Sequence, residues 1–428
     1  MATEVTTMKT IGLTNSALAL ALALPGRFMR SGASASVRIL REIQNNFDVV
    51  FFPTVKLLTL NNSAEIIEAL ESHVGVPSCA RRLALRLQGS PIYRLSRLLG
   101  SSLYQEVANE YKNCLQERPD LLFDPDYLDP DVAFLSSTMK VNFGINVQSD
   151  YFSYDNLGIW PKRFSIAVSP GGHPCLLKFY AQSVAANALP INRLRLSLST
   201  DRLKFVSYVS YGALMESFLN RLAVPKIVID PAYAVDFTPA SRSKSDYALF
   251  FTSLTVSKGL LHLPLVLDQA KDVERLLVFG PYESCSMKAF LKLVKRYHLE
   301  PKVRYLGEIK HGDRFNEVVS HARVVIYPSL QDSFSMVILE SIALGTPVVA
   351  YDLPGPKSVF GGLSAVRFVK TGDIKAMAQQ ANELYNMNGG DLRRMFEEES
   401  YRSFIERHSR WDAVVESYLS VLYRAINC

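Results

Sequence analysis

The chain lacks the features that mark several classes of protein. No apolar run reaches the roughly 18–20 residues that a membrane span needs. Its five cysteines are scattered and odd in number, without C-x-x-C spacing, which argues against a zinc site or a disulfide framework and favours a reducing compartment. The net charge is only +6, so we expect no nucleic-acid partner. The P-loop, H-E-x-x-H and nucleophile-elbow patterns are also missing.

What is present fits two domains of ordinary size. At 428 residues, of which 48% are hydrophobic, the chain can build two separate cores. The polar stretch 240–246 predicts the boundary between them. From Tyr247 onward, apolar strands alternate with helices, which is typical of a parallel, doubly wound sheet. The strands predicted there are 247–252, 275–280, 303–307, 323–328, 346–351 and 365–369, with helices after Lys258, through Lys295, over 313–321 and from Asp373.

The first half reads as a similar but less regular α/β unit. Residues 1–16 are expected to be a polar tail, 17–24 a buried strand, and Ser34–Gln44 a helix after a loop that contains Gly32. A short signal peptide is the alternative for 17–24, because Lys9 precedes an apolar run. Gly32 sits where such a loop could approach a ligand, with a plain turn glycine as the alternative. Further strands are predicted at 47–53, 131–137, 163–170, 203–210 and 226–230, and a final helix at 404–425.

A basic segment, residues 77–105, interrupts this half. It carries five arginines with no acid between them, interleaved with leucines and an isoleucine. Such a segment can lie on an anionic membrane surface. The alternative is a solvated helical face that packs on the domain.

The stretch from Tyr327 to Lys357 holds a helix with an unexpected charge. The helix is predicted to start near Ser333 and to end at Leu344, where Gly345 stops it. Its body is apolar on nearly every face, which predicts burial. Glu340 nevertheless stands in its middle, and a buried carboxylate is costly unless something pairs with it.

A second carboxylate, Asp332, lies eight residues earlier at the mouth of this helix. At ~1.5 Å rise per residue the two are roughly 12 Å apart along the axis. The free N–H groups of the first turn and the helix dipole form a phosphate site beside Asp332. A hydroxyl-rich ligand with a diphosphate in its middle would suit this geometry.

Residues 332–340, D-S-F-S-M-V-I-L-E, followed by S-I-A-L-G-T-P-V-V-A, resemble the E-x7-E segment of retaining GT-B glycosyltransferases of the GT4 type (glycosyl transferases group 1). The usual wording of that family is E-G-F-G-[LM]-x-x-x-E-A-x-A-x-G-x-P-V-V-A. The tract 250–261 is similar to the V-G-R-L-x-x-x-K-G loop of the family. The tract 224–240 is similar to its crossover, with Asp230-Pro231-Ala232 in place of Pro-Asn-Gly.

The resemblance implies an α/β fold of the GT-B kind, with two Rossmann-like, doubly wound domains facing a central cleft. The first, 1–240, would bind the acceptor, and the second, 241–405, the nucleotide sugar. The C-terminal helix, 406–428, would cross back onto the first domain. The resemblance is strong over about 247–425 and thin before 200.

The resemblance also assigns roles to individual residues. Lys258 matches the lysine that neutralises the donor diphosphate, where a fixed cation stabilises charge on the departing nucleotide. Asp332 matches the acid that contacts hydroxyls of the transferred sugar, and Glu340 the acid that accepts hydrogen bonds from the nucleotide ribose. A family arginine falls on Ser253, so one cation is missing. The other expected donor-binding residues are Gly32, Gly280, Ser333, Phe334, Ser335 and Met336, the last three through backbone N–H groups.

His173 completes the expected catalytic set. It follows the predicted strand 163–170, at the end of a strand where ligands of α/β sheets gather, and an acceptor-side histidine can occupy a comparable loop in the family. A structural histidine is the alternative.

The expected activity is sugar transfer from a nucleotide-diphosphate sugar to a hydroxyl of a glycan or lipid-linked acceptor. The resemblance implies retention at the anomeric carbon, no required cofactor and no metal. We expect a cytoplasmic protein that can contact the membrane face through the basic segment. Two alternatives stay open, namely a degenerate GT-B binding subunit and a GT-B nucleotide-sugar epimerase.

Overall fold

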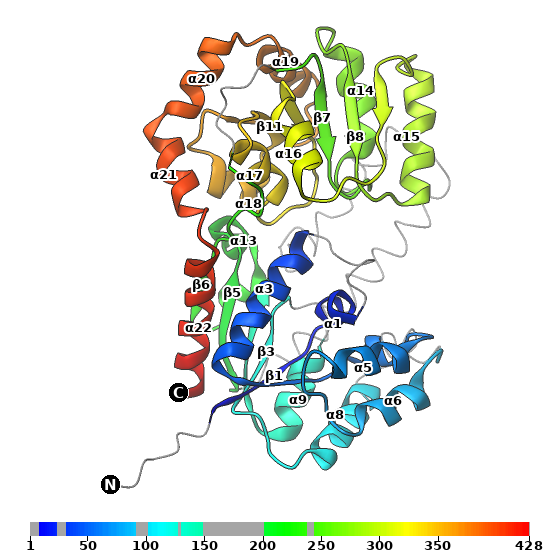
Figure 1. Cartoon of the computed structure of the whole chain (residues 1–428), viewed down its shortest axis with the longest axis vertical. Helices are drawn as coiled ribbons and strands as arrows, with labels where there is room; N and C mark the ends of the chain where they lie inside the picture. The colour runs from blue at the N-terminus through cyan, green and yellow to red at the C-terminus, as the bar shows by residue number, and fades with distance from the viewer. Residues whose placement is uncertain are drawn as a thin grey trace.

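The computed structural model describes residues 8–23, 31–90, 102–126, 130–148, 201–237 and 244–427. Within these residues the chain forms two lobes, each built on a six-stranded sheet (Figure 1). Every strand pair in both sheets is parallel. The expected α/β fold with two doubly wound sheets is thus confirmed.

The strand order is β2-β1-β3-β4-β5-β6 in the first sheet and β12-β11-β10-β7-β8-β9 in the second. The first sheet consists of β1 (Thr10–Leu13), β2 (Asp48–Phe51), β3 (Leu121–Asp124), β4 (Asn142–Val147), β5 (Leu203–Tyr208) and β6 (Lys226–Val228). The second consists of β7 (Ala248–Phe251), β8 (Leu276–Phe279), β9 (Val303–Tyr305), β10 (Val324–Tyr327), β11 (Val348–Tyr351) and β12 (Val366–Val369).

Helices cover these sheets and connect their strands. Those of the first lobe are α1 (Ser16–Ala23), α3 (Ser31–Asn46), α4 (Val55–Leu58), α5 (Ser63–Glu71), α6 (Ala80–Leu87), α8 (Ser102–Cys114), α9 (Asp131–Met139) and α13 (Tyr211–Glu216). Those that follow are α14 (Leu263–Gln269), α15 (Ser284–Arg296), α16 (Asp313–Ser320), α17 (Met336–Ala343), α18 (Pro354–Phe360), α19 (Ile374–Tyr385), α20 (Gly389–Glu397), α21 (Glu399–Arg407) and α22 (Trp411–Asn427).

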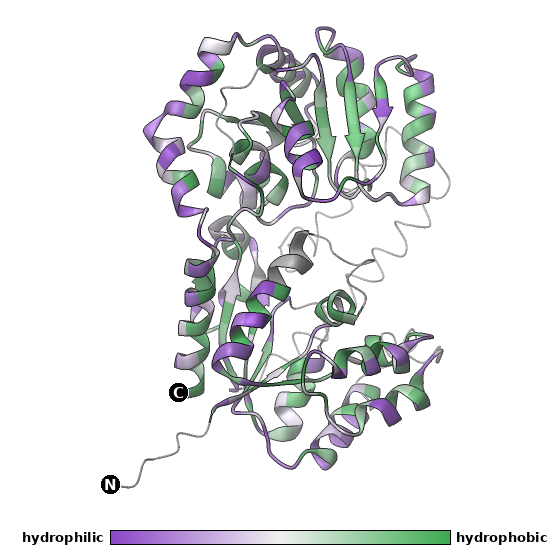
Figure 2. Ribbon diagram, viewed as in Figure 1, coloured by the Kyte–Doolittle hydropathy of each residue, from purple (hydrophilic) through white to green (hydrophobic). Residues whose placement is uncertain are grey.

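The second lobe matches the sequence prediction closely. Each predicted strand from 247 to 369 is present; most are short runs of apolar residues, whereas β9 and β12 each include an arginine. In Figure 2, β7 and β8 are green along most of their length, whereas α15 shows one polar and one apolar side. The helix predicted from Asp373 begins there, because the Asp373 carboxylate caps it by accepting from the amide of Ala376.

The first strand was predicted in the wrong place. Residues 10–13 form β1, which pairs with β2 and β3, so 1–16 is not simply a polar tail. Residues 16–23 form a helix, not a strand. Asn15 accepts a hydrogen bond from the amide of Leu18 at 2.8 Å and caps this helix, and alternating Ala and Leu are both strong helix formers. The absence of polar residues in the run had hidden its helical period.

Residues 131–137 are a second correction, because they lie in helix α9 instead of a strand. This segment is buried on nearly every side, so its sequence has no clear period. The strands of this region are β3 and β4, which flank α9 in the chain. The predicted strand 163–170 and His173 lie outside the described residues.

The end of the chain forms two helices where one was predicted over 404–425. The break falls between α21 and α22, where the carbonyl of His408 accepts a hydrogen bond from the amide of Tyr233. Helix α22 then runs beside the first lobe (Figure 1), and its Tyr418 and Leu422 join a buried cluster with Phe123 of β3. The domain boundaries at 240 and 405 stay predictions; 405 falls within α21.

Two cysteines form a bond that the sequence did not suggest. Cys79 and Cys114 make a disulfide, with Cα atoms 6.0 Å apart, so the expectation against disulfides is wrong for this pair. Cys79 precedes α6 and Cys114 ends α8. Packing of the two helices brings the thiols together although 35 residues separate them.

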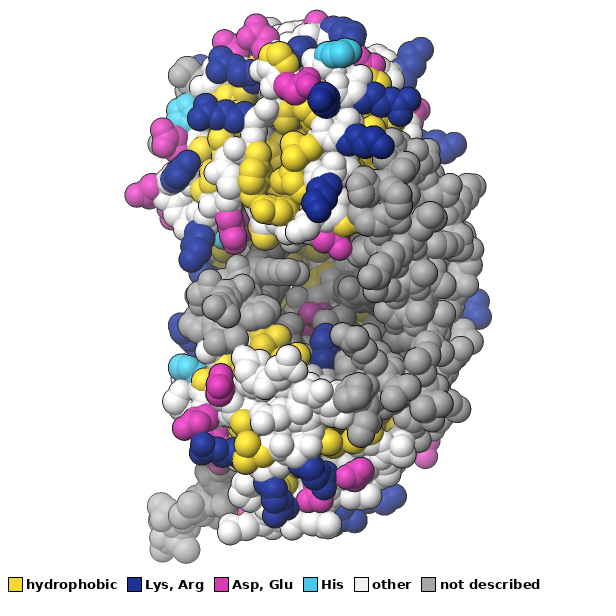
Figure 3. Space-filling view, turned by 90° about the vertical axis from the view of Figure 1, so that its right-hand side faces the viewer, with side chains coloured by type: hydrophobic (Ala, Val, Ile, Leu, Met, Phe, Trp, Pro, Cys, Tyr) yellow, Lys and Arg dark blue, Asp and Glu magenta, His cyan; other side chains and the backbone are white. Residues whose placement is uncertain are grey.

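The basic segment 77–105 is only partly described, because 91–101 lie outside the described ranges. Its helix α6 buries Leu83 and Leu87 and turns its arginines outward. Each of these arginines faces a glutamate; the pairs are Arg81–Glu68, Arg82–Glu110 and Arg86–Glu106, at 3.0, 3.1 and 2.9 Å. On the face in Figure 3, basic and acidic side chains are interspersed over both lobes. No helix of the described residues is long and apolar enough to cross a bilayer.

Candidate functional site

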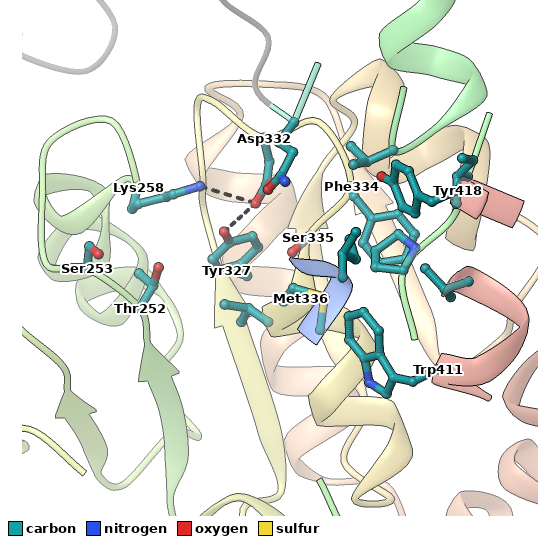
Figure 4. Close-up of a pocket in the computed structure, with 17 residues that line it drawn as sticks. Thr252, Ser253, Lys258, Tyr327, Asp332, Phe334, Ser335, Met336, Trp411 and Tyr418 are labelled. Carbon is teal, nitrogen blue, oxygen red and sulfur yellow. Dashed lines mark hydrogen bonds and ion pairs between the residues drawn. The ribbon is translucent and has the colours of Figure 1, made fainter. Parts of the chain in front are cut away.

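A cavity of about 270 Å³ lies where the two lobes and α22 meet (Figure 4). The second lobe contributes the ends of β7 and β10 and the start of α17. The first lobe contributes Ile39 of α3, and α22 contributes Trp411, Val414 and Tyr418. The cavity therefore lies at the carboxyl ends of parallel strands, where α/β proteins bind their ligands.

Lys258, Asp332 and Tyr327 form a polar cluster in its wall. The Lys258 Nζ donates to the Gln331 carbonyl at 2.8 Å and lies 3.3 Å from Asp332 Oδ2. The Tyr327 hydroxyl donates to the same carboxylate oxygen at 2.6 Å. Burial, together with the nearby Asp332 carboxylate, raises the pKa of Tyr327 to about 12, so this hydroxyl stays a donor at neutral pH. The Lys258 and Asp332 side chains keep 25% and 15% exposure, which leaves both accessible to a ligand.

This pairing depends on the order of strands in the second sheet. Lys258 follows β7 and Asp332 follows β10, and these strands are neighbours although β8 and β9 lie between them in the chain. Gly259 allows the two loops to approach. Its φ of +78° is left-handed, and a Cβ there would collide with the Pro328 carbonyl. The amide of Leu330 also donates to the Ser257 carbonyl at 2.9 Å, which ties the loops together.

Helix α17 begins at Met336, three residues later than predicted. Ser335 adopts φ +85° and caps the helix by accepting from the Ile338 amide at 3.3 Å. Phe334, Ser335 and Met336, which were expected to bind the diphosphate, all line the cavity. The first helical amides have no partner within the helix. An anion is therefore favoured here by the helix end as well as by Lys258.

Ser333 has a structural position. It is buried and outside the cavity lining, and its carbonyl accepts a hydrogen bond at 2.5 Å from the hydroxyl of Ser210 in the first lobe. The neighbouring helices α13 and α18 are also bonded, through the Gly212 amide and the Ser358 hydroxyl at 2.8 Å. The loop that carries Asp332 is therefore anchored to the first lobe.

Glu340 lies apart from the cluster, outside the cavity lining. Its carboxylate is only 4% exposed and lies 2.9 Å from the Nε2 of His311. The hydrogen bond to Glu340 raises the pKa of His311 above its ordinary value, against the opposing effect of burial. Sequence reasoning missed His311. Its position just after the strand VRYLG was the only signal, and nothing local connects it to a residue 29 positions away.

The remaining expected residues divide into three groups. Ser253 lines the cavity at the end of β7. Gly280, at the end of β8, has φ +132°, and a Cβ there would collide with the Thr252 carbonyl. It therefore lets β8 lie close to the end of β7, but it does not line the cavity. Gly32 lies in the first turn of α3, not in the expected loop.

Residues 235–403 match the family model of glycosyl transferases group 1. The N-acetyl-alpha-D-glucosaminyl L-malate synthase of Bacillus anthracis is 28% identical over 152 residues, which are 36% of this chain and 38% of that protein. The chain spans between about a quarter and about a half of the length of the curated relatives that it matches.

Solved structures resemble the whole described architecture. The sucrose-phosphate synthase of Thermosynechococcus elongatus has a TM-score of 0.64 at 15% identity, over 97% of this chain and 98% of that one. The Anabaena protein HepE, solved in complex with UDP and glucose, has a TM-score of 0.62 at 15% identity, over 97% and 100%. At these identities the likeness concerns the fold, and the expected GT-B fold is confirmed.

Proposed function

We propose that the chain transfers a sugar from a nucleotide-diphosphate sugar to an acceptor hydroxyl. Residues 235–403 match the family model of glycosyl transferases group 1, and the chain has the GT-B fold. The observation that carries the proposal is the cation Lys258 beside the open end of helix α17, in a cavity between the lobes. A lysine and a helix N-terminus together suit a diphosphate.

The donor would bind along this wall of the second lobe. Its diphosphate would lie on the amides of Phe334, Ser335 and Met336 and against Lys258. Lys258 is paired with Asp332; a bound diphosphate would take over as its counter-ion, and Asp332 would then be available to hydroxyls of the transferred sugar. Glu340 would accept from the ribose.

In the proposed reaction the acceptor oxygen bonds to the anomeric carbon while the bond from that carbon to the diphosphate oxygen breaks. The acceptor proton leaves with the nucleoside diphosphate, whose growing negative charge Lys258 stabilises. The configuration at the anomeric carbon is retained, and no metal or cofactor is required. Ser253 stands where the family has an arginine, so Lys258 carries more of this stabilisation here.

The acceptor is proposed to be a glycan or lipid-linked hydroxyl compound bound by the first lobe. His173 is proposed to contact it. The N-acetyl-alpha-D-glucosaminyl L-malate synthase joins a sugar to a small hydroxy acid, as its name says, so a small acceptor belongs in the same test panel.

The test is nucleotide release from UDP-, GDP- and ADP-sugars with and without hydroxyl acceptors. Lys258→Met is expected to lower kcat by about 10²–10³-fold, and Glu340→Ala to raise the KM for the donor. Lys292→Met, on the exposed side of α15, is the matched control and should leave both unchanged. If no nucleotide sugar binds or reacts and Glu340→Ala behaves as the wild type, the proposal is wrong.

Two further measurements address the course of the reaction. The anomeric proton of the product, followed by NMR, should show the configuration of the donor, and an inverted product would contradict retention. Activity should survive dialysis against a chelator. A loss that added metal restores would contradict the metal-independent course.

A non-enzymatic binding subunit is the second candidate, and Ser253 favours it because it removes a cation from the donor site. In that case the chain binds a nucleotide without turnover. Ser253→Arg is the sharpest variant: it should tighten donor binding in either case but should raise the release rate only in an enzyme. A nucleotide-sugar epimerase would instead return an altered nucleotide sugar without an acceptor.

We also propose that the protein contacts an anionic membrane surface through the segment 77–105. Glu110 pairs with both Arg82 and Arg86. Glu110→Gln should therefore free Arg82, while Arg86 keeps its pair with Glu106, and flotation with anionic liposomes should increase. Reversal of charge at Arg81, Arg82 and Arg86 should abolish flotation, and neutral liposomes are the control. Equal flotation of all variants would remove the membrane proposal.

A further inference from the structure

The carboxylate of Glu340 needs a partner. Its side chain is 4% exposed in helix α17, and Leu339 and Ile342 of the same helix are fully buried. A charge in such surroundings is costly unless it is hydrogen-bonded. Among the described residues its side chain accepts one hydrogen bond, from His311 Nε2 to Oε1 at 2.9 Å. The second carboxylate oxygen is left to another partner.

The imidazole of His311 is held in place from behind. Its ring lies against that of Phe315, with centroids 4.5 Å apart. Phe315 is buried and packs edge-to-face with Phe251 of β7 and Phe279 of β8, at 5.3 and 5.7 Å. His311 itself is 42% exposed. A rigid aromatic cluster thus supports one side of the ring while the other side reaches solvent.

Glu340 lies on the same side of α17 as the cavity wall. Met336 and Val337 line the cavity, and they precede Glu340 by four and three residues. Residues at this spacing share a helix face, and one turn advances about 5.4 Å. The carboxylate therefore lies one turn beyond the cavity lining, where a nucleoside that extends from a diphosphate at the helix end would reach it.

We propose that His311 is a positioning residue, which fixes one oxygen of Glu340 so that the other accepts hydrogen bonds from the ribose hydroxyls of the donor nucleotide. This inference rests on the proposed function. It concerns a residue that lies outside the matched E-x7-E segment, on the loop between β9 and α16. The raised pKa of His311 agrees with a charge-assisted contact, which is stronger than a neutral one.

The test measures discrimination between ribose and deoxyribose. The affinities of UDP and GDP, and of their 2′,3′-dideoxy forms, are measured by calorimetry. The nucleotide whose ribose form binds more tightly is then used to compare the variants. The wild type should prefer the ribose form by roughly 10- to 100-fold, the usual effect of hydrogen bonds to a charged group. His311→Phe keeps a ring against Phe315 but has no donor, and it should reduce this preference to about 3-fold or less. His311→Gln restores an N–H donor and should recover part of the preference.

A role in folding alone would not produce this pattern. It would lower the melting temperature of His311→Phe and leave the ratio of the two affinities unchanged, and that result overturns the inference. In a Glu340→Ala background, His311→Phe should have no further effect on the ratio. If the wild type binds neither nucleotide, the proposed function falls and the inference with it. If His311→Phe binds and turns over donor with the wild-type ratio, only the inference falls.

Discussion

Replacing Gly259 with alanine tests how closely the Lys258 loop must approach the loop before α17. Gly259 has φ +78°, and a Cβ there would collide with the Pro328 carbonyl. Gly307 is a matched control in the same lobe, because its φ is +81° and nothing lies within 4 Å of its Cβ position. Both variants bear the cost of an L-residue in the left-handed region, but only Gly259→Ala must also separate two loops.

The magnitudes follow from this difference. The left-handed conformation costs alanine about 1–2 kcal/mol, which is the whole expected loss for Gly307→Ala. Separation of the loops in Gly259→Ala also weakens the Leu330–Ser257 and Lys258–Gln331 hydrogen bonds. Each such bond contributes about 0.5–1.5 kcal/mol, so the expected total is about 2–5 kcal/mol.

The assay is urea unfolding of both variants, followed by circular dichroism, with the midpoint and the slope compared. Nucleotide release by Gly259→Ala should also fall by roughly 100-fold, since a shift of about 1 Å in a catalytic group can have that effect. If Gly259→Ala loses no more stability than Gly307→Ala and keeps its release rate, the close approach of the loops is not what positions Lys258.

Three further predictions concern stability. Lys244 donates hydrogen bonds to three oxygens at the ends of α16 and α17. Lys244→Met should lower the free energy of unfolding in urea by about 1–3 kcal/mol, because buried acceptors lose their donor. An unchanged urea midpoint would contradict this role of Lys244. The Cys79–Cys114 disulfide closes a loop of 35 residues, so its reduction should lower the free energy of unfolding by roughly 3–4 kcal/mol. Peptide mapping of the unreduced protein that finds both cysteines as free thiols would contradict the disulfide. Glu340 raises the folded-state pKa of His311 above 6.5. Their pairing therefore stabilises the folded protein fully below that pH, and this stabilisation is lost as the pH rises through the raised pKa. The melting temperature of the wild type minus that of His311→Phe should shrink from about pH 5.5 to about pH 8.5, and a constant difference would exclude the pairing.

The second lobe was predictable because its signals are local. Most of its strands are short apolar runs bounded by polar residues or glycine, and Asp373 and Gly345 mark helix ends within the same few residues. The burial of Glu340 in an apolar helix could be read from the chain, but its separation from Asp332 could not, because Asp332 lies in the loop before α17. The start of the helix could not, because Ser335 adopts a left-handed conformation that favours glycine.

The first half was less predictable for a physical reason. In 16–23 and 131–139, apolar residues occupy almost every position, so helix and strand give the same pattern, and only the neighbours decide. The cap of Asn15 on the first helix and the pairing of residues 10–13 with two strands settle it in the folded chain.

The sequence by itself determined the alternation of elements in the second lobe, the fold class and three charged residues of the candidate site, namely Lys258, Asp332 and Glu340. Tertiary structure alone decided which of those residues meet. Lys258 and Asp332 are 74 positions apart and become partners because β7 lies beside β10. Glu340 acquires His311 because the loop after β9 lies next to α17. Helix and strand preferences depend on interactions between residues a few positions apart in the chain. The contacts of Lys258 with Asp332 and of Glu340 with His311 depend instead on the order of strands in the sheet, which only the folded chain establishes.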